Sequence, residues 1–288
     1  MHGIVLAGGY GSRLWPITSV VSKQLLPVYD KPMIYYPLSL VMAAGIRDIS
    51  VITTPRDIRL FEQLLGDGDQ WGIRISYVTQ ATPKGLPEAF VLISQSTLEH
   101  GSLLILGDNL FYGSKMAEKV RELIALPGAA IFGYLVNDVS AYGSFELNAQ
   151  SEIVSLFEKV ARGKGYAIPG IYKFDASVQS RTLTLQPSTR GEVEIVDLLR
   201  IYLKDELLRH RILDRGTAWL DTGTVENLNQ ANELVRVIQS RQDMLVGSPD
   251  EVALRQGWTN PGVLSERIKM FRDSAYAMSL KQLLIQYE

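Results

Sequence analysis

Short apolar runs alternate with helical patterns in the first half of the chain. Five runs have the length and composition of strands that are covered on both faces: residues 3–7, 49–53, 73–79, 103–106 and 130–134. Between them, apolar residues recur at helical spacing in three segments: residues 33–44, 58–65 and 116–126. This alternation predicts a parallel sheet with crossover helices.

Local signals suggest where two of these helices begin and end. Asp30 is a candidate N-cap and Gly45 a candidate terminator for residues 33–44, although Pro37 should kink or delay that helix. Ser114 is a candidate N-cap for residues 116–126.

The pattern changes in the second half of the chain. Three further strand-like pieces follow at residues 143–147, 153–158 and 170–174, with no linker before them, so we interpret them as an extension of the same sheet. Beyond Thr224 one helical face carries four apolar residues, and a last helix is expected at residues 277–287. The four are Leu228, Ala231, Leu234 and Ile238. We therefore divide the chain into a core, residues 1–226, and a C-terminal helical region, residues 227–288, whose apolar face packs onto the core.

Composition narrows the possible chemistry. With 29 Lys and Arg against 31 Asp and Glu, the net charge of −2 provides no global attraction for nucleic acid, so any anion site must be built locally. The absence of cysteine excludes disulfides and thiolate chemistry, and no leader or membrane-spanning pattern is evident, so we expect a cytoplasmic protein without a membrane partner. The only histidines, His2, His100 and His210, are scattered. Carboxylates, lysines and arginines are left to carry the chemistry.

A glycine-rich loop follows the first predicted strand. Gly8, Gly9 and Gly11 stand where an open α/β sheet presents backbone amides to a ligand, and glycine allows a close approach to phosphate oxygens. Arg13 and Lys23 can add positive charge. The loop lacks the last glycine of the dinucleotide fingerprint and is not a P-loop. From its residues alone, a phosphate-binding loop and a plain glycine-rich turn both remain open.

Acidic residues mark the ends of further predicted strands. Asp108 follows residues 103–106 and Asp221 precedes Thr-Gly-Thr, and oxygen ligands of this kind suit Mg²⁺. The alternative is a turn-forming or capping role. Glu158 and Lys159 end another strand, where a solvated surface pair is the alternative to a binding role.

Longer motifs connect these features. Gly8-Gly9-Tyr10-Gly11-Ser12-Arg13-Leu14, then Trp15-Pro16 and Ser22-Lys23-Gln24-Leu25-Leu26-Pro27, closely resemble the signature of sugar-phosphate nucleotidyltransferases. The continuation over residues 28–38 is similar to the glucose-1-phosphate thymidylyltransferase branch. The likeness extends through Leu106-Gly107-Asp108-Asn109, Arg190-Gly191-Glu192-Val193-Glu194-Ile195 and Trp219-Leu220-Asp221-Thr222-Gly223-Thr224, and covers most of residues 1–260.

The resemblance implies a fold, a reaction and an assembly. The fold is α/β: a Rossmann-like open mixed sheet flanked by helices, with sugar-binding strand insertions and a C-terminal helical appendage. The reaction condenses dTTP with α-D-glucose 1-phosphate to give dTDP-glucose and pyrophosphate, and depends on Mg²⁺. The assembly is a homotetramer, in which the C-terminal region has an oligomeric or regulatory role.

The resemblance also implies a role for each site residue. Asp108 and Asp221 would hold the metal, and Arg13, Lys23 and Lys159 would be the catalytic cations. The nucleotide-binding set is Gly8, Gly9, Gly11, Ser12, Arg13, Lys23, Gln24, Gln80, Pro83 and Gly85. The sugar-binding set is Asn109, Gly143, Glu158, Lys159, Tyr172 and Glu192.

Three departures from the usual pattern of the family affect substrate choice. Val160 replaces a proline after Lys159, Pro169 replaces a hydroxyl-bearing residue, and Glu88 replaces a glutamine. Glu88 either faces the substrate or caps the following helix. Another sugar 1-phosphate or UTP therefore remains an alternative, as does a catalytically reduced sugar-nucleotide-binding regulatory protein. Because Gln80 and Gly85 are retained, a pyrimidine nucleotide is favoured.

Overall fold

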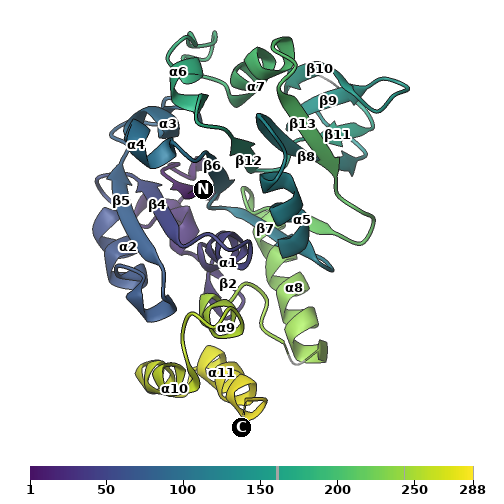
Figure 1. Ribbon diagram of the computed structural model, residues 1–288. Helices are drawn as coiled ribbons and strands as arrows, with labels where there is room; N and C mark the ends of the chain where they lie inside the picture. Colours follow the sequence, from purple (N-terminus) through teal and green to yellow (C-terminus); the bar gives the residue numbers. More distant parts are fainter. Residues whose placement is uncertain (160–161, 243, 288) are drawn as a thin grey trace.

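The main sheet of the protein runs through most of the molecule (Figure 1). A computed structural model describes residues 1–159, 162–242 and 244–287. Within them a ten-stranded sheet has the order β10-β9-β11-β8-β12-β6-β1-β4-β5, and β13 pairs with β8. The strands of the parallel part are β1 (His2–Ala7), β4 (Asp48–Thr53), β5 (Arg74–Thr79) and β6 (Ser102–Leu106). The others are β8 (Ala129–Val136), β9 (Gly143–Leu147), β10 (Ile153–Glu158), β11 (Gly165–Ala167), β12 (Ile171–Phe174) and β13 (Leu208–Ile212).

Helices cover both faces of this sheet because consecutive strand residues point to opposite sides. Val5 belongs to one buried cluster and its neighbour Ile4 to another, and both are fully buried. The first cluster includes residues of α1 (Tyr35–Ala43), α2 (Ile58–Leu65) and α5 (Met116–Ile124). The second includes residues of α3 (Glu88–Leu92), α4 (Gln95–Leu98), α6 (Val178–Thr182) and α7 (Ile195–Lys204). The predicted α/β class with a mixed sheet is confirmed.

The predicted elements agree closely with the structure, but the predicted N-caps do not. Residues 58–65, 143–147 and 153–158 match their elements, and the ends of the other predicted strands shift by a residue or two. Pro37 lies in the first turn of α1, where a missing N–H is tolerated. Asp30 forms an ion pair with Lys31 and does not cap α1. Lys115, not Ser114, occupies the N-cap position of α5. Both N-cap predictions were therefore wrong.

Among the elements that the patterns did not predict, which include α7 and β13, is a small second sheet. It pairs β7 (Asn109–Tyr112) with β14 (Ala218–Asp221) in antiparallel orientation, so that Asp221 lies opposite Asn109. A short hairpin precedes α1; its two strands, β2 (Pro27–Val28) and β3 (Lys31–Pro32), have two residues each. Both pairs are too short to produce a periodic signal in the sequence.

The C-terminal helices share cores with the first part of the chain. They are α8 (Val225–Gln242), α9 (Pro249–Arg255), α10 (Pro261–Met270) and α11 (Ala275–Ile285). Ala231 and Ile238 of α8 are buried in a cluster with Leu14 and Val28, and Leu228 and Leu234 pack at its edge. Figure 1 shows α9, α10 and α11 gathered beyond α1, at the end of the molecule away from β9 and β10. None of the helices in the described ranges is long and apolar enough to cross a membrane.

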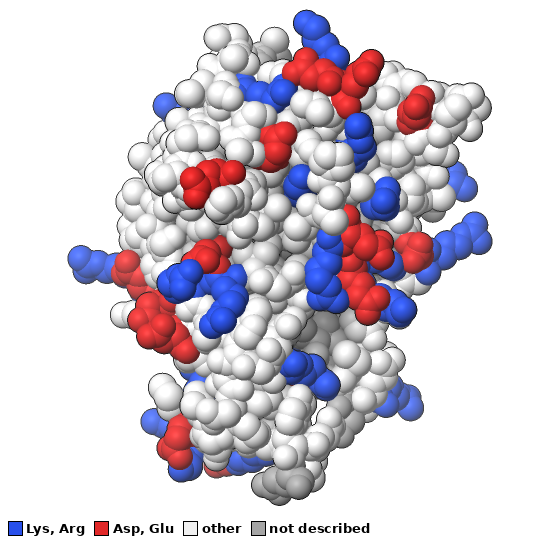
Figure 2. All heavy atoms as spheres, in the orientation of Figure 1, with Lys and Arg blue, Asp and Glu red and all other residues white. Residues whose placement is uncertain are grey.

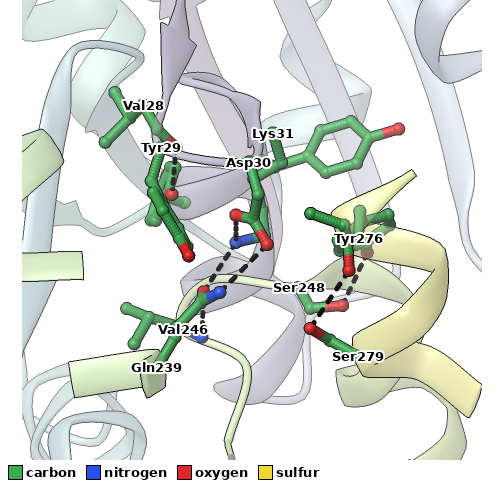
Figure 3. A network of polar contacts seen from close by, with 12 residues as sticks. Val28, Tyr29, Asp30, Lys31, Gln239, Val246, Ser248, Tyr276 and Ser279 are labelled. Atoms are coloured by element: carbon green, nitrogen blue, oxygen red, sulfur yellow. Dashed lines mark hydrogen bonds and ion pairs between the residues drawn. The ribbon is translucent and has the colours of Figure 1, made fainter. Parts of the chain in front are cut away.

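A buried polar network ties the β2–β3 hairpin to these helices (Figure 3). The Lys31 ammonium donates to the Asp30 carboxylate at 2.5 Å and to the Gln239 side-chain oxygen at 2.9 Å. The Gln239 amide nitrogen in turn donates to Asp30 at 2.9 Å, and the backbone N–H of Val246 donates to the Gln239 oxygen at 3.1 Å. The Lys31 nitrogen also lies 5.6 Å from the centre of the Tyr276 ring. Residues from three separate parts of the chain therefore meet around one buried ammonium group.

Candidate active site

The candidate site lies where the connections of the sheet reverse direction. From β1 the chain moves outward to β4 and β5, and then returns to form β6 on the other side of β1. In such sheets a crevice opens at the carboxyl ends of the strands beside the reversal point. Gly8 follows β1 there, and Asp108 lies just beyond β6. The glycine-rich loop and one of the predicted metal ligands are thus neighbours in the fold.

The glycine-rich loop has a shape that other residues would not easily adopt. Gly11 lies in the left-handed region with φ of 60°, where a side chain would be strained, and its carbonyl accepts a hydrogen bond of 2.7 Å from Thr18 Oγ1. A Cβ atom on Gly8 would lie only 2.8 Å from the Oε1 atom of Gln80. Glycine at position 11 therefore suits the turn, and glycine at position 8 leaves room for the Gln80 side chain.

A cavity of about 320 Å³ opens beside this loop. Most of the predicted nucleotide-binding residues line it: Gly8, Gly9, Lys23, Gln24, Gln80, Pro83 and Gly85. Gly11, Ser12 and Arg13 do not line this cavity, and Arg13 instead lines the adjoining one. Gly85 has a φ of 110°, and a Cβ atom there would lie 2.0 Å from the carbonyl oxygen of Val193. The loop that carries Pro83 and Gly85 is therefore packed against the backbone of the 190s segment.

The two aspartates predicted to bind metal come together although they are far apart in sequence. The Thr222 backbone N–H and hydroxyl donate to the Asp108 carbonyl at 3.0 and 2.8 Å, which places Asp221 beside it. Both carboxylates line the adjoining cavity. Burial raises the pKa of Asp221, as does the nearby charge of Asp108, whereas a hydrogen bond from Asn227 opposes the shift. Two carboxylates that repel each other in this way suit a divalent cation.

The predicted cations lie on either side of these carboxylates. Lys23 forms an ion pair with Asp108. Burial on its own would raise the pKa of Asp108, but the Lys23 ammonium and hydrogen bonds hold it below its usual range. The Arg13 guanidinium lies next to Gly223, where a Cβ atom would come within 2.8 Å of it. Both cations therefore lie beside acidic groups, and the face shown in Figure 2 likewise carries small groups of both signs.

The adjoining cavity, of about 180 Å³, contains most of the predicted sugar-binding residues. Asn109, Gly143, Glu158, Lys159 and Tyr172 line it, whereas Glu192 lines the larger cavity. The Asn109 side-chain oxygen accepts hydrogen bonds from Trp219 Nε1 at 2.6 Å and from the Gly170 N–H at 3.2 Å. Burial raises the pKa of Tyr172, so its hydroxyl stays protonated and can donate. Groups of the protein itself therefore hold the Asn109 side chain in this orientation.

Three residues that stand in the quoted motifs belong to this site but were missing from the predicted site residues. The Arg190 guanidinium bridges Glu158 at 3.1 Å and Glu194 at 2.8 Å, and Glu194 lines the larger cavity. Trp219 lines the smaller one. All three stood inside motifs that carried the resemblance, so the signal was present, but nothing in the motif distinguished them from their neighbours.

The three departures from the family pattern differ in their consequences. Val160 lies outside the described residues, and Lys159 before it has a φ of 56°. Ile168 and Gly170 line the smaller cavity, but Pro169 between them does not. Glu88 does not line the larger cavity, and its carboxylate accepts hydrogen bonds from Gln80 Nε2 at 2.6 Å and from the Lys84 N–H at 3.1 Å. It does not line the substrate space, and although it stands in the first turn of α3, where negative charge is favourable, its carboxylate does not hydrogen-bond to the backbone of that helix.

Comparison with known proteins agrees with this geometry. The profile of the nucleotidyl transferase family matches residues 2–237. The chain belongs to the nucleotidyl transferase family. It is 47% identical to a glucose-1-phosphate thymidylyltransferase of Mycobacterium tuberculosis over 99% of both chains. It is 46% identical to an enzyme of the same name from Neisseria gonorrhoeae, again over 99% of both chains.

A solved structure of this nucleotidyl transferase family is also similar. It is a candidate glucose-1-phosphate thymidylyltransferase from Bacillus anthracis in complex with sucrose, 34% identical, with a TM-score of 0.74. The match covers 82% of this chain and 96% of that one. The predicted family and the predicted enzyme class, a nucleotidyltransferase, are therefore confirmed.

Proposed function

We propose that this nucleotidyltransferase condenses dTTP with α-D-glucose 1-phosphate and releases dTDP-glucose and pyrophosphate. The observation that carries the proposal is the meeting of the glycine-rich loop, Lys23, Asp108 and Asp221 around two joined cavities. Relatives with the name of this activity match the chain over nearly its whole length. The larger cavity would take the nucleotide and the smaller one the sugar phosphate.

The transfer needs positioning and charge compensation more than acid–base chemistry. A phosphate monoester has a second pKa of about 6, so the attacking oxygen of the sugar phosphate is largely ionised near neutrality. That oxygen would attack the α-phosphorus in line as the bond to the β-phosphate breaks, and pyrophosphate leaves with the electron pair. Arg13 and Lys23 would stabilise the leaving group, and Lys159 would hold the nucleophile. No histidine or cysteine is required.

The paired carboxylates support a requirement for a divalent cation. Among the described residues no cluster of three or more His, Cys, Asp or Glu side chains stands ready to hold a metal. Mg²⁺ commonly uses one or two carboxylates and takes its other oxygens from water and substrate phosphates, which fits Asp108 and Asp221. When bound, the ion would neutralise charge on the phosphate oxygens. Because ATP, UTP and dTTP share those oxygens, the metal would not choose the base.

A substrate matrix tests this proposal. Pyrophosphate release would be measured for dTTP, UTP, dCTP and ATP against glucose 1-phosphate and other hexose 1-phosphates, with and without Mg²⁺. We expect the highest kcat/KM for dTTP with glucose 1-phosphate, and no turnover in excess EDTA. A preference for another sugar or for UTP would change the substrate but keep the reaction. Binding of sugar nucleotides without pyrophosphate release in any combination would contradict the proposal and favour a regulatory protein.

We also propose a homotetramer, in which the region from residue 227 onward has an oligomeric or regulatory role. This assembly is an expectation from the family resemblance, and light scattering at several protein concentrations tests it. A strictly monomeric protein would contradict it. The division of the chain at residue 226 and a cytoplasmic location stay predictions from the sequence.

A further inference from the structure

Gln80 is placed to read the base of a nucleotide, and its side-chain orientation therefore matters. It follows β5, and its backbone N–H donates to the Thr53 carbonyl at 2.8 Å. Its side chain is only 3% exposed and lines the larger cavity beside Gly8. A primary amide presents an acceptor on one side and donors on the other. The side of the Gln80 amide that faces the cavity therefore determines which edge of a base Gln80 can bind.

Glu88 fixes that orientation. Its Oε2 atom accepts from Gln80 Nε2 at 2.6 Å, and the Lys84 N–H holds the same oxygen at 3.1 Å. A carboxylate has no proton to give, so only the nitrogen side of the Gln80 amide can face it. The Lys84 N–H requires an acceptor at this same atom, so the side-chain oxygen of a glutamine here could hold Gln80 in the same way, whereas alanine could not.

The opposite side of the amide is then left for a ligand. Gln80 Oε1 points to the glycine-rich loop, since a Cβ atom on Gly8 would lie 2.8 Å from it. Among the described residues no donor forms a hydrogen bond to this oxygen, and it is not enclosed as the unpaired hydroxyl oxygens of Ser102 and Ser144 are. An accessible, unpaired acceptor on the cavity wall is complementary to an N–H donor of a base.

We propose that Glu88 is a positioning residue that sets base specificity, by holding Gln80 with its oxygen toward the nucleotide. This inference rests on the proposed function. Thymine and uracil carry a hydrogen at N3 that this oxygen can accept. Cytosine has an acceptor at N3, so two acceptors would face each other and dCTP is rejected. The residue acts through Gln80 and does not touch the substrate. The same contact cannot separate dTTP from dUTP, because both present the N3 hydrogen.

The Glu88→Ala variant tests this role, since it leaves Gln80 without its anchor. The ratio of kcat/KM for dTTP to that for dCTP, with glucose 1-phosphate, is expected to fall about tenfold to a hundredfold, the range of one unsatisfied hydrogen bond. The ratio for dTTP to dUTP is expected to stay unchanged. Glu88→Gln, which can present an acceptor oxygen to both donors, should keep the ratios of the parent. Glu122→Gln, on an exposed position of α5, is the matched control.

Binding measurements separate this inference from the proposed function. Isothermal titration of dTTP and dCTP without sugar phosphate reports base selection even where turnover is absent, and should show the same loss of discrimination in Glu88→Ala. An unchanged dTTP-to-dCTP ratio in Glu88→Ala would overturn the positioning role while leaving the reaction intact. An equal loss for dTTP, dUTP and dCTP would also overturn it, because that result indicates a merely structural residue. A parent protein that binds dTTP selectively but never releases pyrophosphate would contradict only the proposed reaction.

Discussion

Two buried lysine–aspartate pairs in this protein have the same chemistry but different surroundings. Lys31 and Asp30 are sealed beneath the C-terminal helices, with side-chain exposures of 1% and 3%, and Gln239 bonds to both. Lys23 and Asp108 lie on the wall of the larger cavity, and 18% of the Asp108 side chain is exposed. Burial lowers the pKa of Lys31, against the opposing charge of Asp30. The comparison indicates that a saturated pair organises the fold, whereas a pair open to a cavity can exchange partners with a ligand.

The same substitution at both lysines should give opposite results. Lys23→Met is expected to lower kcat/KM about a thousandfold, the effect of losing one preorganised charge that stabilises a transition state. Its stability loss should be the smaller of the two, because water in the cavity can reach Asp108. Steady-state pyrophosphate release measures the first effect and urea unfolding the second. A kcat/KM near that of the parent would show that Lys23 does not contribute to the reaction.

Lys31→Met is expected to change stability instead of activity. Removing one partner of a buried pair leaves an uncompensated charge, here the Asp30 carboxylate, and typically costs about 3 kcal/mol or more. Urea unfolding should show this loss, while the folded variant keeps a kcat/KM close to that of the parent, because Lys31 does not line either cavity. A large fall in kcat/KM with unchanged stability would contradict this assignment, because it would mean that Lys31 acts in the reaction and not in the fold.

Gln239→Leu should have a smaller effect of the same kind. It leaves Lys31, Asp30 and the Val246 N–H each without one hydrogen bond, and we expect a loss of about 1–2 kcal/mol in the free energy of unfolding. Substituting Gln242 on the last turn of α8, whose side chain accepts a hydrogen bond from Tyr112, provides a control in the same helix. Equal losses in the free energy of unfolding at both positions would mean that the network around Lys31 stabilises the protein no more than the single contact of Gln242 does.

Removing both charges of the sealed pair should have the smallest effect. In Asp30→Leu combined with Lys31→Met, no unpaired charge is left, and replacing a buried pair by apolar groups is often nearly neutral, within about 1 kcal/mol. Unfolding of this variant beside the parent and both single variants, Lys31→Met and Asp30→Leu, gives the coupling between the two residues. If the double variant is as unstable as the Lys31→Met variant, the network stabilises the protein through more than charge compensation.

Sequence patterns predicted the parts of this molecule that local chemistry determines. β1, β4 and β6 are largely buried on both faces, so each appears as a mostly apolar run with clear ends, whereas the edge strand β5 also carries exposed polar residues. Gly8 and Gly11 were recognisable because the loop needs residues without side chains. The neighbourhood of Asp108 and Asp221 could not be read from spacing, since it depends on the pairing of two short strands more than a hundred residues apart, and only the motif resemblance indicated it.

Contacts between distant segments explain the predictions that failed. Asp30 has the residue type of an N-cap, but Lys31 and Gln239, the latter 209 residues away, bind its carboxylate. Glu88 begins a helix and could have been a cap or a substrate ligand, but the bend between β5 and α3 brings Gln80 back against it. Side chains that suit several roles are assigned one of them only by tertiary structure.

The packing of α1 has a consequence for how the protein melts. Tyr35 of α1 is 4% exposed, and its ring lies 5.7 Å from that of Trp71 and 6.2 Å from that of Tyr276 in α11. Separation of α11 from α1 would expose to water the aromatic cluster of Tyr35, Trp71 and Tyr276, which also stabilises the first half of the chain. The C-terminal helices and the nucleotide-binding half are therefore expected to unfold together. A thermogram should consequently contain one cooperative peak, and chains truncated near residue 226 should aggregate.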